Sequence, residues 1–429
     1  MTSRLVPALA LGAAALTVAA CGGGGGTDAK QAAQARGPIK IWYSNNAEEV
    51  AWGKQMVAAW NAKHPNEKVT GQEIPTGKSS EDVIGAAITA GNAPCLVLNT
   101  SPAAIPQFQK QGGLVALDDL PGGKQYVEQR TGAKAEQYQS PDGKYYQLPW
   151  KSNPVMIIYN KKLFKQAGID ADKPPLSTYS EFLDTSRKLV SSKAAPAAIY
   201  PAPTSEFYQS WFDYYPLFIA ATGKQLVQDG KPQFDSPEGQ QVAAFWKTMY
   251  SEQLAPNEKY NGDAFADGKA AMAIVGPWAI AVYGDKVDWG VAPVPTQDGK
   301  PASDIHTFSD EKSIAMYSAC KNRGTAWDLL KFATSKEQDG EFLKATGQMP
   351  MRENLTDTYA DYFSQKPEYK VFAEQAARTV EVPNVANSVE IWQAFRDAYS
   401  KAVIFSKQDP NQALKDAAGK IQGLAGQGS

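Results

Sequence analysis

Histidine and cysteine are scarce in this sequence. Its 429 residues include two histidines, His64 and His306, and three cysteines. A histidine-based zinc site or a Ser-His-Asp triad would have to use one of those two histidines. The sequence also lacks GxSxG, HExxH, a Walker-type phosphate loop and a GxGxxG following a strand. We therefore expect a protein that is not an enzyme and that holds no metal and no cofactor.

The chain also lacks an excess of charge of one sign and long apolar runs after its first twenty residues. Its 43 Lys and Arg residues nearly balance its 45 Asp and Glu residues, and the formal net charge is -2. Nucleic acids and anionic membrane surfaces attract basic proteins, so neither is predicted as a partner. No stretch after residue 20 approaches the roughly 20 apolar residues of a transmembrane helix.

The N-terminus carries a secretion signal. Residues 1–20, MTSRLVPALALGAAALTVAA, combine an early Arg4 with an apolar run that ends in small residues, which is typical of a cleaved signal peptide. Residues 21–37, CGGGGGTDAKQAAQARG, are glycine-rich and predict a flexible tether. The segment Val18-Ala19-Ala20-Cys21 resembles the lipobox of bacterial lipoproteins, which implies that Cys21 is acylated. A lipid anchor of this kind would hold the mature chain on the outer face of the cytoplasmic membrane.

Two cysteines remain once Cys21 is assigned to lipid. Cys95 and Cys320 would lie in an oxidising compartment, where they could form a disulfide. Each also adjoins an apolar run that predicts a strand, so two separate buried thiols are an equally good interpretation.

Strands and helices alternate along the start of the mature domain. IKIWYS (39–44) predicts a buried strand, and residues 48–65 predict an amphipathic helix that ends at Pro65. A strand over 68–75, a helix over 80–91 and a strand over 94–100 follow. This order predicts a parallel sheet with helices on both faces. The length and the 43% hydrophobic content favour two domains.

Polar residues follow two of these predicted strands. Ligands bind beyond the carboxyl ends of the strands in such sheets, so the polar side chains there are candidates for ligand contact. The candidates are Asn45 and Asn46 after the first strand, beside Ser44, and Asn99 and Ser101 at the end of the third, beside Thr100. The alternative is that each one is a helix cap or a turn residue.

Aromatic residues are abundant, with 10 Trp, 19 Tyr and 16 Phe. A sugar has an apolar ring face and a rim of hydroxyls, so its site needs flat side chains together with amide, carboxylate or indole N–H groups. The segment SEFYQSWFDYYPLF (205–218) is unusually aromatic, although a core helix would explain it equally well. In the segment 268–290, Trp278 directly follows a Gly-Pro pair that ends an apolar run.

From about Ile39 to its C-terminus, the sequence resembles the family 1 extracellular solute-binding proteins of ABC importers, which include the maltose-binding proteins. Four segments carry the resemblance: AGNAPCLVL, the stretch from LPW to YNKKLFKQAG, DGKAAMAIVGPWA, and VDWGVAPVP. Cys95 departs from the family pattern, which usually has Asp at this place, and the departure favours a bonded partner for this cysteine.

The resemblance implies a two-lobed α/β fold of the periplasmic-binding-protein type. Each lobe would contain a parallel-rich sheet flanked by helices, and a hinge would join the lobes around an interlobe ligand cleft. The implied division places residues 38–151 and 306–350 in lobe 1, and residues 152–305 and 351–429 in lobe 2.

The resemblance also implies site residues, because the matching segments line the cleft in that family. Trp278 would stack on a sugar ring, with a buried structural tryptophan as the alternative. The other residues implied for the cleft are Trp150, Lys151, Asn153, Phe207, Tyr208, Trp211, Gly276, His306 and Arg352.

The function that this resemblance implies is capture of a mono- or oligosaccharide and its delivery to the membrane subunits of an ABC permease by a monomeric, lipid-anchored protein. One alternative keeps the fold but binds a glycerophosphodiester or another polar osmolyte, which would require basic residues in the cleft; Lys151 and Arg352 are the basic candidates. Another is a secreted carbohydrate-active enzyme, which would need two carboxylates facing the cleft, and no sequence motif marks such a pair.

Overall fold

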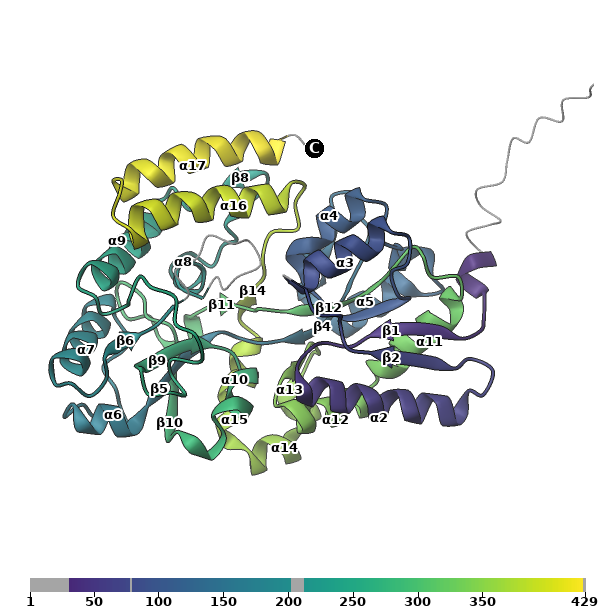
Figure 1. Cartoon of the computed structure of the whole chain (residues 1–429), viewed down its shortest axis with the longest axis horizontal. Helices are drawn as coiled ribbons and strands as arrows, with labels where there is room; N and C mark the ends of the chain where they lie inside the picture. Colours follow the sequence, from purple (N-terminus) through teal and green to yellow (C-terminus); the bar gives the residue numbers. More distant parts are fainter. Residues whose placement is uncertain (1–30, 78, 202–211, 427–429) are drawn as a thin grey trace, which may run out of the picture.

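The computed structural model describes residues 31–77, 79–201 and 212–426, which form two lobes built around separate sheets (Figure 1). The predicted signal peptide, Cys21 and the first part of the tether lie outside the described residues, as do Phe207, Tyr208 and Trp211. Within the described residues, no helix has both the length and the apolar character needed to cross a bilayer.

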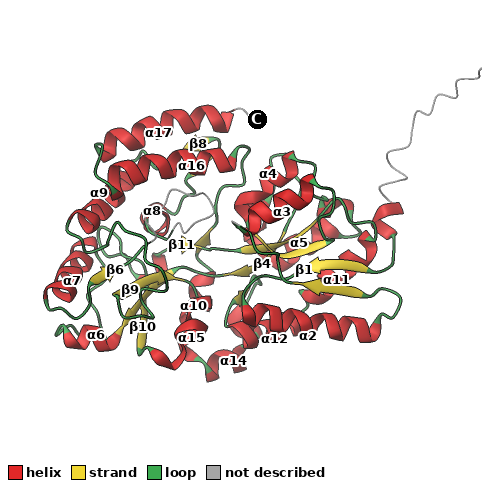
Figure 2. Ribbon diagram, in the orientation of Figure 1, coloured by secondary structure: helices red, strands yellow, loops and turns green. Residues whose placement is uncertain are grey.

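Lobe 1 is a six-stranded sheet with helices on both faces (Figure 2). The strands lie in the order β13 (Met349–Pro350), β4 (Leu148–Ser152), β12 (Lys312–Met316), β3 (Leu96–Thr100), β1 (Ile39–Trp42) and β2 (Val69–Gln72). Leu96 and Leu98 of β3 face one layer of the core, and Val97 between them faces the other. This alternation follows from the two-residue period of a strand and buries both faces of the sheet.

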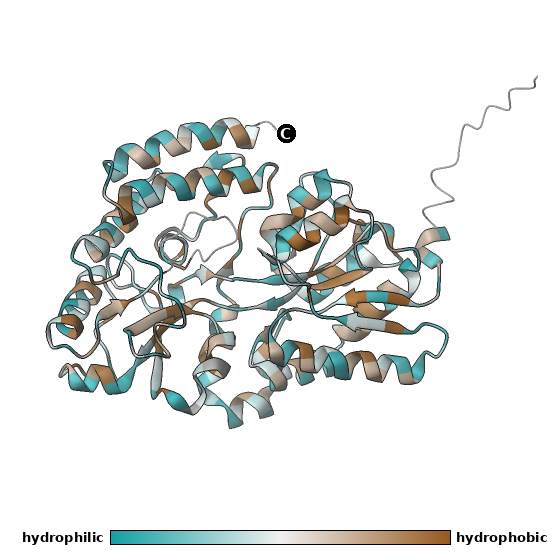
Figure 3. Ribbon diagram, viewed as in Figure 1, coloured by the Kyte–Doolittle hydropathy of each residue, from teal (hydrophilic) through white to brown (hydrophobic). Residues whose placement is uncertain are grey.

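The helices of lobe 1 divide between those two layers. Apolar side chains of α2 (Ala47–Lys63), α5 (Gly123–Thr131), α11 (Arg323–Ala333) and α12 (Lys336–Thr346) belong to the layer of Leu96 and Leu98. Those of α3 (Ser80–Thr89) and α4 (Ile105–Lys110) belong to the layer of Val97. Figure 3 shows the result: apolar residues concentrate on the strands, and the helices mix apolar and polar residues.

Lobe 2 contains a four-stranded sheet in the order β10 (Trp289–Ala292), β5 (Met156–Asn160), β9 (Ala270–Val275) and β6 (Ala197–Ile199). The described end of the aromatic segment 205–218 forms part of a core helix, α8 (Tyr214–Thr222), in which Tyr214, Tyr215 and Phe218 are fully buried. The remaining helices are α6 (Lys161–Gln166), α7 (Tyr179–Ser191), α8 (Tyr214–Thr222), α9 (Pro237–Ser251), α10 (Trp278–Tyr283), α13 (Leu355–Thr358), α14 (Ala360–Gln365), α15 (Pro367–Ala376), α16 (Ser388–Tyr399) and α17 (Pro410–Ala425).

The chain passes between the two sheets several times. It leaves lobe 1 between β4 and β5, returns between β11 (Thr307–Phe308) and β12, and leaves again after β13. β11 pairs with β14 (Thr379–Val380), and Ile305 and Phe308 pack in the core of lobe 2. The strands therefore place the second crossing at residues 309–311, a few residues after the boundary predicted at residue 306.

The two-lobed α/β fold is confirmed, but the sheets are mixed rather than parallel-rich. In lobe 1, β1 is parallel to β2 and β3, whereas β12 is antiparallel to β3 and β4. In lobe 2, only β6 and β9 are parallel, and β5 is antiparallel to both of its neighbours. The crossings explain this: a strand that enters a lobe through the hinge runs opposite to the strands that point toward the hinge.

Residues 31–37 differ from the flexible tether predicted there. Residues 31–34 are helical, and Ala33 is buried in the core of lobe 1. Arg36 forms ion pairs with Glu67 and Asp328, and the backbone N–H of Gly37 donates to Thr325 Oγ1. The tether prediction is wrong for these residues because one small apolar side chain and one arginine are enough to dock them on α11.

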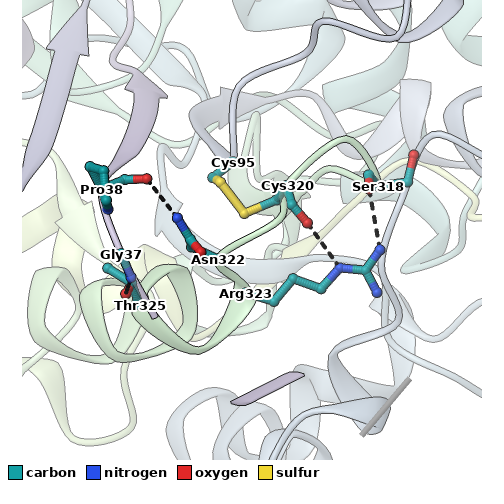
Figure 4. The surroundings of a disulfide bond; sticks show 8 residues. All are labelled: Gly37, Pro38, Cys95, Ser318, Cys320, Asn322, Arg323 and Thr325. Carbon is teal, nitrogen blue, oxygen red and sulfur yellow. Dashed lines mark hydrogen bonds between the residues drawn. A yellow bond between two sulfur atoms is a disulfide. The ribbon is translucent and has the colours of Figure 1, made fainter. Parts of the chain in front are cut away.

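Cys95 and Cys320 form a disulfide, which decides between the two interpretations of these cysteines (Figure 4). Cys95 directly precedes β3, and Cys320 lies just beyond β12. Their Cα atoms are 4.5 Å apart although 225 positions separate them in the chain. The bond therefore fastens two neighbouring strands at the edge of the sheet opposite to the hinge.

Candidate functional site

The edges of the two sheets that face the hinge define an interlobe cleft. On the lobe 1 side, β1, β3 and β4 end at this edge and β12 begins there, as their pairing requires. On the lobe 2 side, β6, β9 and β10 end and β5 begins. A crevice beyond strand ends is the usual ligand site of open α/β sheets.

Trp278 lies at the lobe 2 side of this cleft, three residues after the end of β9. It begins α10, is partly exposed, and packs against two apolar clusters of the lobe. The ring of Phe212 lies 5.6 Å from its ring, centroid to centroid, at 38°. One part of the indole is thus fixed by packing while another part remains accessible, as stacking on a ligand would require.

Gly276 permits the orientation of Trp278. A Cβ at this position would lie 2.0 Å from a ring carbon of Trp278 and 2.9 Å from the carbonyl oxygen of Asn153. Both separations are far below van der Waals contact, so no other residue fits without movement. The structure therefore brings together three predicted site residues: Asn153 from the first crossing, and Gly276 and Trp278 from the turn between β9 and α10.

Asn153 occupies the first crossing between the lobes. Its side chain is 3% exposed, and its Nδ2 donates to Gln348 Oε1 at 3.2 Å and to the carbonyl oxygen of Asp310 at 3.4 Å. Its Oδ1 has no hydrogen-bond partner among the described residues. A buried amide oxygen without a partner is costly, and this one has almost no surface open to solvent, so a hydroxyl or water could reach it only if the crossing segments move.

The polar residues after β1 and β3 lie at the cleft edge, but three of them are used by the fold. Ser44 is buried, and its hydroxyl accepts from the N–H of Asn46 at 2.9 Å. The side chain of Asn46 caps α2 by accepting from the N–H of Glu49 at 3.0 Å. Thr100 is fully buried, with its hydroxyl 2.9 Å from that of Tyr317. Asn45 is exposed, and Asn99 and Ser101 are partly exposed, so these three stay candidates for ligand contact.

Trp150 and Lys151 lie inside lobe 1 and are not available to a ligand. Trp150 is 1% exposed, and its ring packs 5.3 Å from that of Trp52 and 4.5 Å from that of Phe342. Lys151 is 1% exposed and forms an ion pair with Glu49 of α2. Burial lowers the pKa of Lys151, and the pKa of Glu49 falls below its usual value because the lysine outweighs the effect of burial.

Arg352 and His306 lie beside the other two crossings. Arg352 is paired with Asp339 and donates to the carbonyl oxygen of Thr334 at 2.7 Å. Arg130 binds the same carboxylate of Asp339 at 2.7 Å. His306 is partly exposed and directly precedes β11 on the lobe 2 side.

A charged group that is not among the predicted site residues lies at the lobe 1 edge of the cleft. Lys312 begins β12 and pairs with Asp310 at 2.9 Å, with both side chains partly exposed. Glu81, in the first turn of α3, is electrostatically coupled to Lys312; burial raises its pKa and Lys312 opposes this. The charged run Asp310-Glu311-Lys312 before an apolar strand was the available signal, because it marks the point where the chain enters a sheet.

In the described part of the chain, no group of three or more His, Cys, Asp or Glu side chains is arranged to hold a metal ion. The site is thus an aromatic ring, amide groups and one charged cluster distributed over two lobes.

A family model described as bacterial extracellular solute-binding protein matches residues 43–340. The chain is 27% identical to the diacetylchitobiose binding protein DasA of Streptomyces coelicolor, covering 83% of both proteins. It is 27% identical to the galactooligosaccharide-binding protein of Bacillus subtilis (96% and 94% covered), and 24% identical to the sn-glycerol-3-phosphate-binding protein UgpB of Shigella flexneri (90% and 92% covered).

Among solved structures, the fold is similar to that of a cyclic alpha-maltosyl-1,6-maltose binding protein from Arthrobacter globiformis. The TM-score is 0.76 at 20% sequence identity, covering 92% of this chain and 100% of that one. At this level of identity the similarity concerns the fold alone, and it agrees with two lobes around a cleft.

Proposed function

Because the chain belongs to the bacterial extracellular solute-binding protein family, we propose that it is the lipid-anchored substrate-binding protein of an ABC importer and captures a neutral mono- or oligosaccharide between its lobes. The observation that carries the proposal is the partly exposed indole of Trp278 at the cleft, which suits the face of a sugar ring; the exposed or partly exposed Asn45, Asn99 and Ser101 are available for the hydroxyls.

The charges at the cleft support a neutral ligand over a phosphate. Lys151 is paired with Glu49. Arg352 and Arg130 share Asp339, which leaves this cluster a formal charge of about +1, but Arg352 already donates to Asp339 and to the carbonyl oxygen of Thr334. Lys312 is paired with Asp310 and coupled to Glu81, so this cluster carries a formal charge of about -1. A phosphate needs cationic hydrogen-bond donors that remain unpaired, whereas sugar hydroxyls bind well to ion-paired carboxylates.

Capture would occur by closure of the lobes. Trp278 belongs to lobe 2, and Asn45, Asn99 and Ser101 belong to lobe 1, so a ligand that contacts both sets stabilises the closed form. That form is the one an ABC permease would recognise, because binding shifts the population toward it. No catalytic step is part of this proposal.

The lipid anchor is the acylated Cys21, and residues 22–30 would be the tether that remains once residues 31–37 are docked. Those docked residues contact α11, at the end of lobe 1 away from the cleft (Figure 1). Attachment there leaves the cleft open to solutes. Replacing Cys21 with Ala would release the protein from the membrane fraction and abolish labelling by radioactive palmitate; unchanged membrane retention would contradict the anchor.

A thermal-shift screen tests the ligand class. The mature chain with Cys21→Ser is heated alone and with millimolar diacetylchitobiose, galactooligosaccharides, maltotriose, glycerophosphodiesters and sn-glycerol 3-phosphate. A ligand that binds the native state raises the melting temperature by mass action, even at micromolar affinity. We expect a neutral saccharide to stabilise the protein. Stabilisation by a phosphate alone would overturn the ligand class and leave the fold assignment intact.

The same screen separates binding from hydrolysis. After incubation with the stabilising saccharide, we expect the sugar to be recovered unchanged by chromatography. Cleavage products in proportion to protein concentration would instead indicate a carbohydrate-active enzyme, in which two cleft carboxylates act as a pair.

A further inference from the structure

Two buried carboxyl groups meet at the hinge. Glu311 lies in the second crossing, between β11 and β12, and Glu381 directly follows β14. Glu311 is 1% exposed and Glu381 is 2% exposed. Buried carboxyls of this kind cost free energy when ionised unless a cation or several hydrogen bonds compensate the charge.

The pair connects three segments of the hinge. The backbone N–H of Glu311 donates to Glu381 Oε2 at 2.9 Å, and that of Val382 donates to Glu381 Oε1 at 2.8 Å. Glu311 Oε1 accepts from the N–H of Trp150 in β4 at 3.0 Å and from the hydroxyl of Ser313 at 3.0 Å. A change in the charge of either carboxyl therefore alters hydrogen bonds that involve β4, β12 and the segment after β14.

The groups around the pair compensate the negative charge of the ionised carboxyls poorly. Lys312 is the cation coupled to both carboxyls, but it is held by Asp310 at 2.9 Å and is also coupled to Glu81. Tyr138 of η3 (Gly132–Tyr138) and Tyr215 of α8 are the other titratable neighbours, and both are neutral at physiological pH. Burial raises the pKa of Glu381 to about 8, and burial together with the charge of Glu381 raises the pKa of Glu311 well above its usual range.

We propose that the Glu311–Glu381 pair makes the hinge sensitive to pH: while neutral it holds the crossing segments together, and its ionisation as the pH rises favours separation of the lobes. Opening relieves the ionised pair by admitting water and by moving the two carboxylates apart. If the pKa of a hinge carboxyl is one unit lower in the open form than in the closed form, its ionisation raises the ratio of open to closed molecules by up to tenfold as the pH rises through both values.

Distance measurement between spin labels on the two lobes tests the proposal without any ligand. Lys110 of α4 and Glu390 of α16 are exposed and line opposite sides of a groove of about 620 Å³ between the lobes. Both are changed to Cys and labelled in the full mature chain with Cys21→Ser, where Cys95 and Cys320 are protected as a disulfide. Double electron–electron resonance is recorded at pH 6 and pH 9.

We expect the open population to be several-fold larger at pH 9 than at pH 6 in the otherwise wild-type chain. Glu381→Gln and Glu311→Gln each keep one partner neutral and should reduce this pH response, whereas Glu341→Gln, on the exposed face of α12, should retain it. Identical distance distributions at the two pH values would overturn the proposal, as would an unchanged response in whichever glutamine variant folds.

Discussion

At the scale of single residues, Gly276 and Trp278 work as a unit. The indole occupies the space that a Cβ at Gly276 would need, and Phe212 supports it from another side. The orientation of Trp278, for which the family resemblance implied a ligand contact, therefore depends on that glycine. The accessible part of its ring is a consequence of packing and requires no mobile loop.

We predict that Gly276→Ala displaces the Trp278 ring. The clash should lower the unfolding free energy by about 1–3 kcal/mol, as overpacking does, and weaken saccharide binding. Gly419→Ala is the matched control, because a Cβ on this α17 glycine meets nothing within 4 Å and alanine favours a helix. Denaturant unfolding and tryptophan fluorescence measure the effect; a Gly276→Ala protein indistinguishable from wild type would contradict the packing described.

At the scale of elements, the disulfide joins the start of β3 to the chain after β12. At the ends of these strands away from the disulfide, Thr100 of β3 and Lys312 of β12 lie at the cleft edge. The bond thus stabilises the sheet that positions the site without lying in the site.

Removing the disulfide should cost stability and leave binding intact. For the Cys95→Ala/Cys320→Ala protein we predict a loss of about 2–4 kcal/mol in unfolding free energy, because the bond closes a long loop in the unfolded chain. The melting temperature should fall by several degrees. Calorimetric melting with and without reductant measures this, and a saccharide affinity that falls in parallel would show that the bond also shapes the cleft.

Local patterns in the sequence predicted β1, α2, β2, α3 and β3, because the strands are short runs bounded by polar residues and the helices have apolar residues at helical spacing. They did not predict which side of a strand faces the core. The resemblance implied a cleft position for Trp150 and Lys151, whereas Trp150 packs against Phe342 and Lys151 pairs with Glu49, 102 positions away in the chain. Partners that are remote in sequence decide both cases.

The antiparallel strands escaped prediction for a related reason. Their direction follows from the number of times the chain crosses the hinge, which neither periodicity nor composition encodes. The same holds for Glu311 and Glu381, which are 70 positions apart and meet only because two crossings lie side by side.

At the scale of the whole molecule, the buried hinge carboxyls should make stability depend on pH. An unfolded glutamate has a pKa near 4.3, whereas burial raises that of Glu381 to about 8. At pH values between these two pKa values, Glu381 is protonated in the native state and ionised in the unfolded state. The free energy of unfolding that this group contributes therefore falls as the pH rises.

We predict that Glu381→Gln removes this loss. Its unfolding free energy relative to wild type should increase from pH 5 to pH 8, by up to about 1.4 kcal/mol for each pH unit. Denaturant titrations at pH 5, 7 and 9 give the difference directly. Glu341→Gln, at an exposed position, should show a constant offset; a constant offset for Glu381→Gln would mean that this carboxyl is ionised throughout.

The central claim is that a neutral saccharide binds between the lobes against Trp278. Titration calorimetry of the mature chain with Cys21→Ser, using the saccharides and sn-glycerol 3-phosphate of the screen, tests it most directly. We expect one saccharide site per chain and, for Trp278→Ala, an affinity reduced about tenfold or more, since the lost ring contact is worth about 1.5 kcal/mol or more. Binding of the phosphate alone, or saccharide binding that Trp278→Ala leaves unchanged, would contradict it.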